Sequence, residues 1–129
     1  MRLLLGFAAW ALALPFGADL RAETLSGLWL TGPDAKGQVG HVRLASCGAA
    51  ICGTVLKAFD RNGQPVATPN IGKRVIWDVK PSGSGYAGRM HVSQLKADVD
   101  GTFQVAGKVL TVRGCMGPVC QSQRWKRID

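Results

Sequence analysis

The sequence predicts a small all-β protein, a barrel or sandwich of eight or nine short antiparallel strands stapled by disulfides. Three observations lead to this fold class. Apolar and polar residues alternate with a period of two in most segments after residue 22, the pattern of strands with one buried face. Gly, Pro, Asn and Asp cluster between these segments, where turns require them. The only four cysteines form two C-x4-C units, Cys47 with Cys52 and Cys115 with Cys120.

The first 22 residues have the layout of a secretory signal peptide. Arg2 gives a positive start, an apolar run spans residues 3–14, and the small residue Ala22 lies at the expected cleavage position. A membrane-spanning helix needs about 20 apolar residues, more than this run supplies. We therefore predict cleavage after Ala22 and one domain over residues 23–129. That domain is expected to be periplasmic or secreted and not transmembrane.

The alternation places the strands and their inward faces in chain order. Residues expected to face inward are Val42 and Leu44, then Val75, Trp77 and Val79, then Tyr86, Met90 and Val92, and last Leu110 and Val112. Turns are expected at residues 32–34, 62–65, 81–85 and 100–101. His41 and His91 fall on the polar faces of their strands, where solvent exposure is expected.

If the chain is exported, its four cysteines are expected to form disulfides, because an even number of cysteines in an oxidising compartment indicates disulfides. We expect each unit to close its own hairpin, Cys47 with Cys52 and Cys115 with Cys120, because the two cysteines then face each other across neighbouring strands. A zinc site that uses all four cysteines is the alternative. Redox catalysis is less favoured because the chain has no C-x-x-C motif.

The last expected strand places Gln121, Gln123, Trp125 and Arg127 on one face. If Trp125 points inward, both amides point inward with it, and an unpaired buried amide costs about 1–3 kcal/mol. Polar groups or water in the lumen would supply hydrogen-bond partners for these two amides. The alternative is that they lie near an open rim or bond to neighbouring backbone groups.

A set of residues near both ends of the exported chain carries a family resemblance. The set is Gly27 and Trp29, then Cys47, Cys52 and Gly53, and finally Gly114, Cys115, Cys120, Gln123, Trp125 and Arg127. This pattern resembles an exported bacterial family, the domain of unknown function numbered 2147. The resemblance covers nearly the whole exported chain, although residues 67–102 depart more from the pattern. It implies a small lipocalin-like (calycin-like) all-β barrel with no assigned activity.

A more distant resemblance concerns the closure of the barrel. Lipocalins also begin with G-x-W and bring an arginine from a late strand over that indole. Gly27, Trp29 and Arg127 look similar, and an arginine over an indole stabilises by about 0.5–2 kcal/mol. The resemblance implies that these residues, together with Trp125, close one end of the barrel and have a structural role.

Catalytic groups are scarce in this sequence. Acidic residues are scattered singly, and Asp98 and Asp100 lie beside a predicted turn, where Asp commonly bonds its own backbone. The chain contains no H-E-x-x-H, G-x-S-x-G or phosphate-binding glycine motif. We therefore expect no catalytic residues, no metal and no cofactor.

The exported chain is basic. Without Arg2, Asp19 and Arg21 it carries 14 Lys and Arg and 7 Asp and Glu. The expected basic surface is Arg113, Arg124 and Lys126. This excess of positive charge favours binding to anionic envelope components, or it simply keeps the barrel soluble. Nucleic acid is not expected as a partner, because the chain is exported and lacks an aromatic stacking patch.

These observations favour a non-catalytic binding protein that takes a small or lipid-like ligand in its lumen. The expected lining residues are Trp77, Tyr86, Met90, Phe103, Gln121 and Gln123. The alternative is an envelope protein that binds anionic lipid, polysaccharide or protein through its basic surface. An internal cavity of roughly several hundred Å³ would favour the first hypothesis, and a filled barrel with clustered cations the second.

Overall fold

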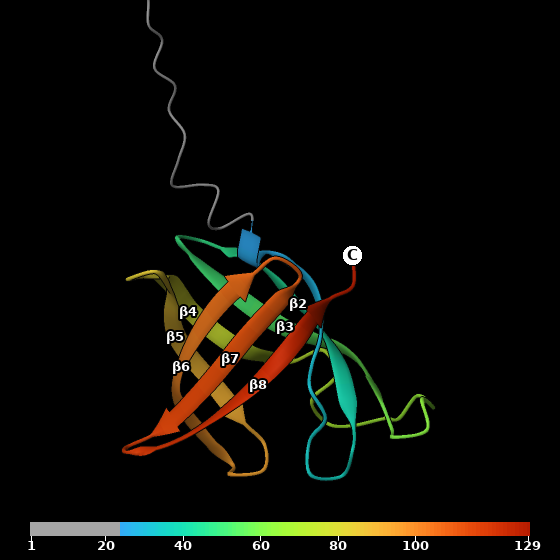
Figure 1. Cartoon of the computed structure of the whole chain (residues 1–129). Coiled ribbons are helices and arrows are strands. Elements are labelled where there is room, and N and C mark those ends of the chain that lie inside the picture. The colour runs from blue at the N-terminus through green and yellow to red at the C-terminus, as the bar shows by residue number, and fades with distance from the viewer. Residues whose placement is uncertain (1–23) are drawn as a thin grey trace, which may run out of the picture.

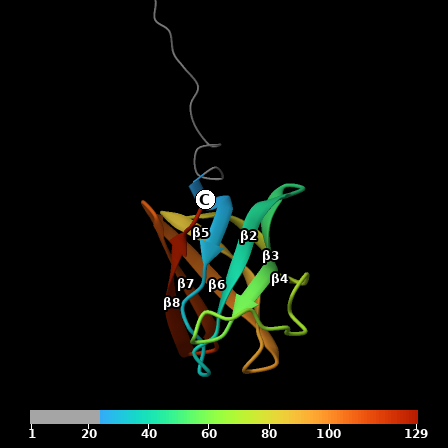
Figure 2. The ribbon, with the colours of Figure 1, turned by 90° about the vertical axis from the view of Figure 1, so that its right-hand side faces the viewer.

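The chain forms a closed barrel of eight antiparallel strands in sequence order (Figures 1 and 2). The computed structural model describes residues 24–129, so the predicted signal peptide lies outside the described residues. The strands are β1 (Gly27–Leu30), β2 (Val39–Cys47), β3 (Ala50–Phe59), β4 (Arg74–Ser82), β5 (Gly85–Val92), β6 (Ala97–Ala106), β7 (Val109–Met116) and β8 (Val119–Arg127). The predicted small antiparallel barrel is thereby confirmed. No helix among the described residues is long and apolar enough to cross a membrane.

The period-two alternation determines which side chains fill the barrel. On β2, Val42 and Leu44 are buried, and on β7, Leu110 and Val112 are buried, as predicted. The largest fully buried side chains are Trp29, Phe103, Leu25, Leu44, Ile76, Leu110 and Val79. A continuous apolar core therefore occupies the interior of the barrel.

Connections between the strands alternate between the two ends of the barrel, because consecutive strands run antiparallel. One end, which we call the Trp29 end, holds the first described residues, the C-terminus and the β2–β3, β4–β5 and β6–β7 hairpins (Figure 1). The opposite end, which we call the Gln121 end, holds loops 31–38 and 60–73 and the β5–β6 and β7–β8 hairpins.

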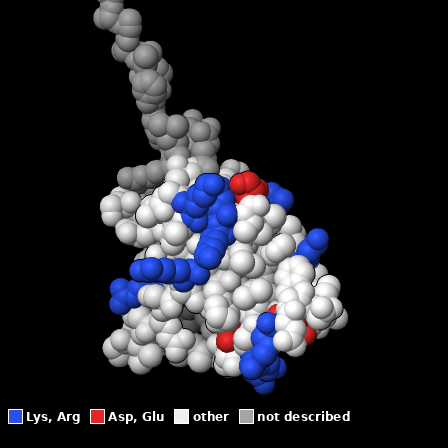
Figure 3. All heavy atoms as spheres, turned by 45° about the vertical axis from the view of Figure 1, so that its right-hand side comes forward, with Lys and Arg blue, Asp and Glu red and all other residues white. Residues whose placement is uncertain are grey.

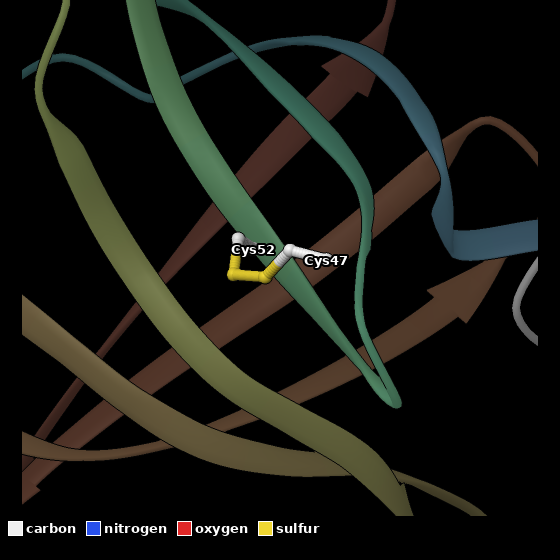
Figure 4. Close-up of a disulfide and its surroundings, with 2 residues drawn as sticks. All are labelled: Cys47 and Cys52. Carbon is white, nitrogen blue, oxygen red and sulfur yellow. A yellow bond between two sulfur atoms is a disulfide. The ribbon is translucent and has the colours of Figure 1, made fainter.

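Each C-x4-C unit forms a disulfide across its own hairpin, as predicted. Cys47 bonds to Cys52 in the β2–β3 hairpin (Figure 4), and Cys115 bonds to Cys120, its direct partner across β7 and β8. The first disulfide lies at the Trp29 end and the second at the Gln121 end. The alternative of one zinc site is wrong, because the cysteines are oxidised in pairs at opposite ends of the barrel.

A bulge in β4 reverses the predicted orientation of Trp77. Asp78 has a positive φ of 56°, and the β4–β5 register shifts between Trp77 and Lys80. Ile76, not Trp77, is therefore buried beside Val79. Trp77 pairs with Arg89, which faces outward, so the expectation that Trp77 faces the lumen is wrong.

The turn predicted at residues 100–101 is also wrong. Asp100 and Gly101 lie inside β6, paired with Cys115 and Gly114 of β7. The chain turns instead between β5 and β6 at residues 93–96. Gly101 does not form a turn. Its lack of a side chain leaves room for neighbouring side chains inside the barrel.

The seam that closes the barrel is short. Strand β1 pairs with β8 only through Trp29 with Arg127 and Leu30 with Lys126, whereas β7 and β8 pair along their whole length. Toward the Gln121 end, loop 31–38 takes the place of a paired strand beside β8. The wall of the barrel is therefore least continuous at that end.

Candidate ligand-binding site

Arg127 and Trp29 close the Trp29 end of the barrel. The Arg127 guanidinium lies 4.4 Å from the centroid of the indole, and Trp29 is fully buried. Trp29 Nε1 donates a hydrogen bond of 3.0 Å to the Leu25 carbonyl. Arg127 donates to the carbonyls of Ser26, at 2.9 Å, and Thr24. These contacts tie the segment before β1 to the last strand.

Gly27 makes room for the guanidinium. Its φ of 145° lies in a region that side chains rarely adopt, and a Cβ atom at this position would collide with the Arg127 side chain. Glycine is therefore required both for backbone conformation and for close approach. Gly27, Trp29 and Arg127 form one packed unit, and Trp125 is buried on the same face of β8 as Arg127.

Gln123 is held inside the barrel wall by two hydrogen bonds. Its Oε1 accepts from Trp125 Nε1 at 2.7 Å, and its Nε2 donates to the Pro33 carbonyl at 3.4 Å. Of the two possibilities left open for this amide, the structure shows bonding to neighbouring groups. Gln121 lies one row nearer the end of the barrel, on the same face, and is exposed.

Met90 packs close to two glycines of neighbouring strands, Gly101 and Gly114. A Cβ atom on Gly101 would lie 3.1 Å from Met90 Sδ, and one on Gly114 would lie 3.5 Å from the same atom. Gly101 pairs with Gly114, and Gly114 pairs with Gln121. The flexible Met90 thioether thus shares the room left by two inward-facing glycines with Phe103, beside Gly101, and with Val99, beside Gly114.

The six predicted lining residues do not form one wall. Tyr86 and Phe103 are buried, at 5% and 0% exposure, as members of the core, and Trp77 lies on the outer face. Met90, Gln121 and Gln123 come together toward the Gln121 end.

Two hollows lie outside this region. One of about 100 Å³ is bounded by the β2–β3 hairpin and by Val79, Pro81 and Tyr86. Another of about 410 Å³ lies along β5, β6 and β7, lined by Ser82, Gly85, Tyr86, Ala87, Thr102, Gln104, Thr111 and Arg113. Thr102 and Arg113 pair on the outer face of the sheet, so this larger hollow is a surface groove and not a lumen.

Two cross-strand ion pairs lie on the outside of the barrel. His91 Nδ1 lies 2.8 Å from Asp98 Oδ1, and Arg89 Nη1 lies 2.8 Å from Asp100 Oδ1. Both aspartates thus pair across strands and do not serve the predicted turn. Among residues 24–129 no polar or charged residue is buried, and no group of three or more His, Cys, Asp or Glu is placed to hold a metal.

His41 differs from an ordinary surface histidine. Its ring packs against Phe59 with centroids 5.0 Å apart. Partial burial lowers the pKa of His41, and the positive charge of Lys57 lowers it further. His41 is therefore biased toward its neutral form, on the outer face and away from the lumen.

The predicted basic residues Arg113, Arg124 and Lys126 are all exposed. They lie on the outer faces of β7 and β8, and the ion pairs among residues 24–129 involve other cations, Arg89, His91 and Arg127. Figure 3 shows Lys and Arg side chains gathered in a band on one face of the barrel, with few acidic side chains near them.

Sequence reasoning missed the residues that shape the Gln121 end. Gly101 and the carbonyl of Pro33 belong to no motif. Gly114 belongs to the terminal family motif and shares the inward parity of Val112 on β7, but neither feature indicated a role at this end. The contacts of Gly101 and Pro33 depend on strand register and on a loop distant in sequence, which alternation alone does not specify.

The closed eight-stranded barrel, with an arginine sealing a buried indole at one end, defines a lipocalin-like protein. A solved structure described as protein HP1028 from the human pathogen Helicobacter pylori, of the lipocalin family, is similar with a TM-score of 0.63 and 13% identity, over 81% of this chain and 83% of that one. At this identity the likeness shows the fold alone. A search of curated proteins found no match.

The sequence also matches a family profile over residues 27–127, described as uncharacterized protein conserved in bacteria (DUF2147). The chain belongs to this family, as its terminal motifs indicated.

Proposed function

We propose that this protein binds a small, lipid-like ligand through the Gln121 end of its barrel and does not catalyse a reaction. The observation that carries the proposal is the packing of Met90 over Gly101 and Gly114. A methionine side chain is unbranched and changes rotamer at little cost. When it swings aside, the two glycines leave an apolar recess within the β5–β7 wall.

The surroundings of this recess suit an amphiphile. Val99 is 3% exposed and packs against the Gly114 position, which supplies an apolar contact for a ligand chain. Gln121 is exposed on the same face, and its amide offers both a donor and an acceptor to a polar head group. At the opposite end Trp29 and Arg127 close the side formed by β1 and β8, and the hollow there is only about 100 Å³, so we expect a ligand to enter from the Gln121 end.

The proposal that the protein is not an enzyme is argued from the positions of its acid and base side chains. The His91–Asp98 pair lies on the outer face, with side chains 36% and 51% exposed. A general base must reach the atom whose proton it abstracts, and this pair does not reach the recess. Export to the periplasm or medium is likewise proposed, because two disulfides are typical of an oxidising compartment.

Fluorescence titration with a long-chain fatty acid that carries a fluorophore tests the proposal. The ligand is kept below its micelle concentration so that single molecules are measured. We expect saturable binding at one site and an affinity at least about tenfold lower in Gln121→Trp, because an indole at this position blocks the recess. Ser122→Trp is the matched control, since Ser122 is the next residue, is also exposed, and faces outward.

Two outcomes would overturn the proposal. Absence of saturable binding by the wild type is one, provided that native mass spectrometry also finds no co-purified small molecule. The other is an equal loss of affinity in Gln121→Trp and Ser122→Trp, which would place the ligand on the outer face.

The apolar core that fills the barrel and the band of cations on its surface (Figure 3) together favour a second candidate function, binding of an anionic envelope component to the outer face of β7 and β8. Arg113 adjoins the groove of about 410 Å³, whose Ser, Thr and Gln side chains suit hydroxyl-rich partners. Arg113→Ser combined with Arg124→Ser should then weaken binding to an anionic polysaccharide at low salt. Fatty-acid binding should stay unchanged in this variant.

A further inference from the structure

Apolar side chains are exposed in unusual number at the Gln121 end. The three most exposed large apolar side chains of the described residues are Val119 at 67%, Leu95 at 54% and Met116 at 47%. All three lie at the β5–β6 and β7–β8 hairpins, which adjoin because β6 pairs with β7. Ile71, at 40%, lies in loop 60–73 at the same end. We call these four residues the apolar rim.

The tip of the β7–β8 hairpin has no polar side chain. Residues 116–119 read Met-Gly-Pro-Val and are all exposed, and the Cys115–Cys120 disulfide holds the base of this tip. Met116 pairs with Val119 two positions beyond the Gly114–Gln121 pair. By strand alternation their side chains lie on the lumen-facing side of the hairpin. The tip is a rigid apolar projection at the entrance to the recess.

Cations accompany the apolar rim. Lys96 directly follows Leu95, and Lys73 follows Ile71 by two residues. A hydrogen bond of 2.8 Å from Asn70 Nδ2 to Ser93 Oγ joins the two segments that carry them. The nearby carboxylates in loops 31–38 and 60–73 accept backbone N–H groups within their own turns: Asp34 from Lys36 and Gln38, and Asp60 from Asn62 and Gln64.

We propose that the apolar rim docks the Gln121 end onto an anionic lipid bilayer. Separate apolar tips on rigid hairpins can each enter a soft interface, whereas a protein partner would need a matching hollow for every tip. Flanking lysines add electrostatic attraction to anionic head groups. Amphipathic helices that lie in the membrane interface likewise combine apolar side chains with Lys and Arg. This inference does not depend on a ligand in the barrel.

Vesicle flotation with the oxidised wild-type protein tests the docking. Vesicles of phosphatidylcholine with about 30% phosphatidylglycerol are the probe. We expect the protein to float with these vesicles, and the variant Met116→Ser with Val119→Ser to partition at least about tenfold less, because two apolar side chains no longer enter the interface. The matched control is Val109→Ser with Ile128→Ser, since these residues are 37% and 40% exposed but lie at the Trp29 end.

Several results would overturn the docking proposal. Failure of the wild type to float is one, and equal losses in the two double variants is another. If Arg124→Glu with Lys126→Glu abolishes flotation while the rim variant floats normally, the outer basic face is the docking surface. If the rim variant instead converts a dimer to a monomer in sedimentation equilibrium and floats like the wild type, the rim binds a second copy.

The fatty-acid titration separates this inference from the proposed ligand site. If the wild type and Gln121→Trp both float but the wild type binds no fatty acid, the docking inference stands and the proposed ligand site is wrong. If the wild type binds fatty acid saturably but does not float with the vesicles, the proposed ligand site stands and the docking inference is wrong.

Discussion

The Arg127 guanidinium lies over the Trp29 indole and reaches past it to the carbonyls of Ser26 and Thr24. The hydrogen bond to Ser26 joins residues 101 positions apart in the sequence. Because β1 and β8 share only two register pairs, these side-chain contacts strengthen the shortest seam of the barrel. Closure at this end is thus achieved by one cation, one indole and the space left by Gly27.

Replacing Arg127 by Leu should lower the free energy of unfolding by about 1–3 kcal/mol. The variant loses the cation–π contact and the charge-assisted hydrogen bonds to backbone carbonyls. Urea unfolding followed by tryptophan fluorescence measures the change. Arg124→Leu, on the exposed face of the same strand, should shift the midpoint much less. Equal effects of the two substitutions would contradict a specific closure.

Trp125 and Gln123 should show a large coupling energy. Gln123→Leu leaves the indole N–H of a 5% exposed tryptophan without its acceptor, a cost of about 1–3 kcal/mol. Trp125→Phe removes the donor, so Gln123→Leu should cost less in that background. A double-mutant cycle by urea unfolding gives the coupling directly. Additive effects would show that the hydrogen bond contributes little.

Each disulfide should stabilise the barrel by about 2 kcal/mol, since both close short loops. Replacing Cys47 and Cys52 by Ser, or Cys115 and Cys120 by Ser, should therefore lower the free energy of unfolding by similar amounts. The two losses should add, because the bonds lie at opposite ends. Peptide mapping without reduction should find both within-hairpin bonds, and a bond between the two units would contradict this arrangement.

Met90→Ala should weaken folding and strengthen ligand binding. Removing this side chain costs about 2–5 kcal/mol of stability through the cavity it leaves, but the recess over Gly101 and Gly114 becomes free for a ligand. Leu110→Ala is the control, because Leu110 is fully buried beside Trp125 toward the sealed end. It should cost comparable stability without raising fatty-acid affinity in the fluorescence titration. Equal affinity changes would exclude Met90 as the gate.

His41 should titrate below its ordinary pKa of about 6.5. Burial and then Lys57 lower the pKa of His41 in the folded state, so protonation favours the unfolded state. The stabilising contribution of neutral His41 is complete above pH 6.5 and is lost as the pH falls through the folded-state pKa. NMR titration of the ring protons measures the midpoint. Lys57→Met should raise it partway, and a wild-type midpoint at or above 6.5 would contradict the prediction.

The local pattern of residues was sufficient to predict most of the strands and both disulfides. Alternation identified the inward faces of β2 and β7, because it depends only on a side-chain period of two. Each disulfide joins residues five positions apart, so a short hairpin brings the cysteines together regardless of the rest of the fold. The predicted closure residues were recognisable because they form a terminal motif.

Alternation failed where one residue changed the register. The bulge at Asp78 turned Trp77 outward, because an inserted residue reverses the face of the residues before it relative to the residues after it. Gly101 was assigned to a turn, since a lone Asp-Gly pair is compatible with either a turn or a strand interior. Pairing with Gly114 of β7 decided between them.

By itself, the sequence determined the class of fold, the inward faces of strands without a bulge, such as β2 and β7, and the pairing of the cysteines, because each depends on interactions between near neighbours along the chain. Only the tertiary structure decided that Met90 lies over two glycines from other strands, that Gln123 donates to a carbonyl 90 residues away, and that the apolar tips share one end. These relationships depend on strand order and register around a closed barrel. Such long-range geometry is set by the packing of the whole core and is not encoded in any single segment.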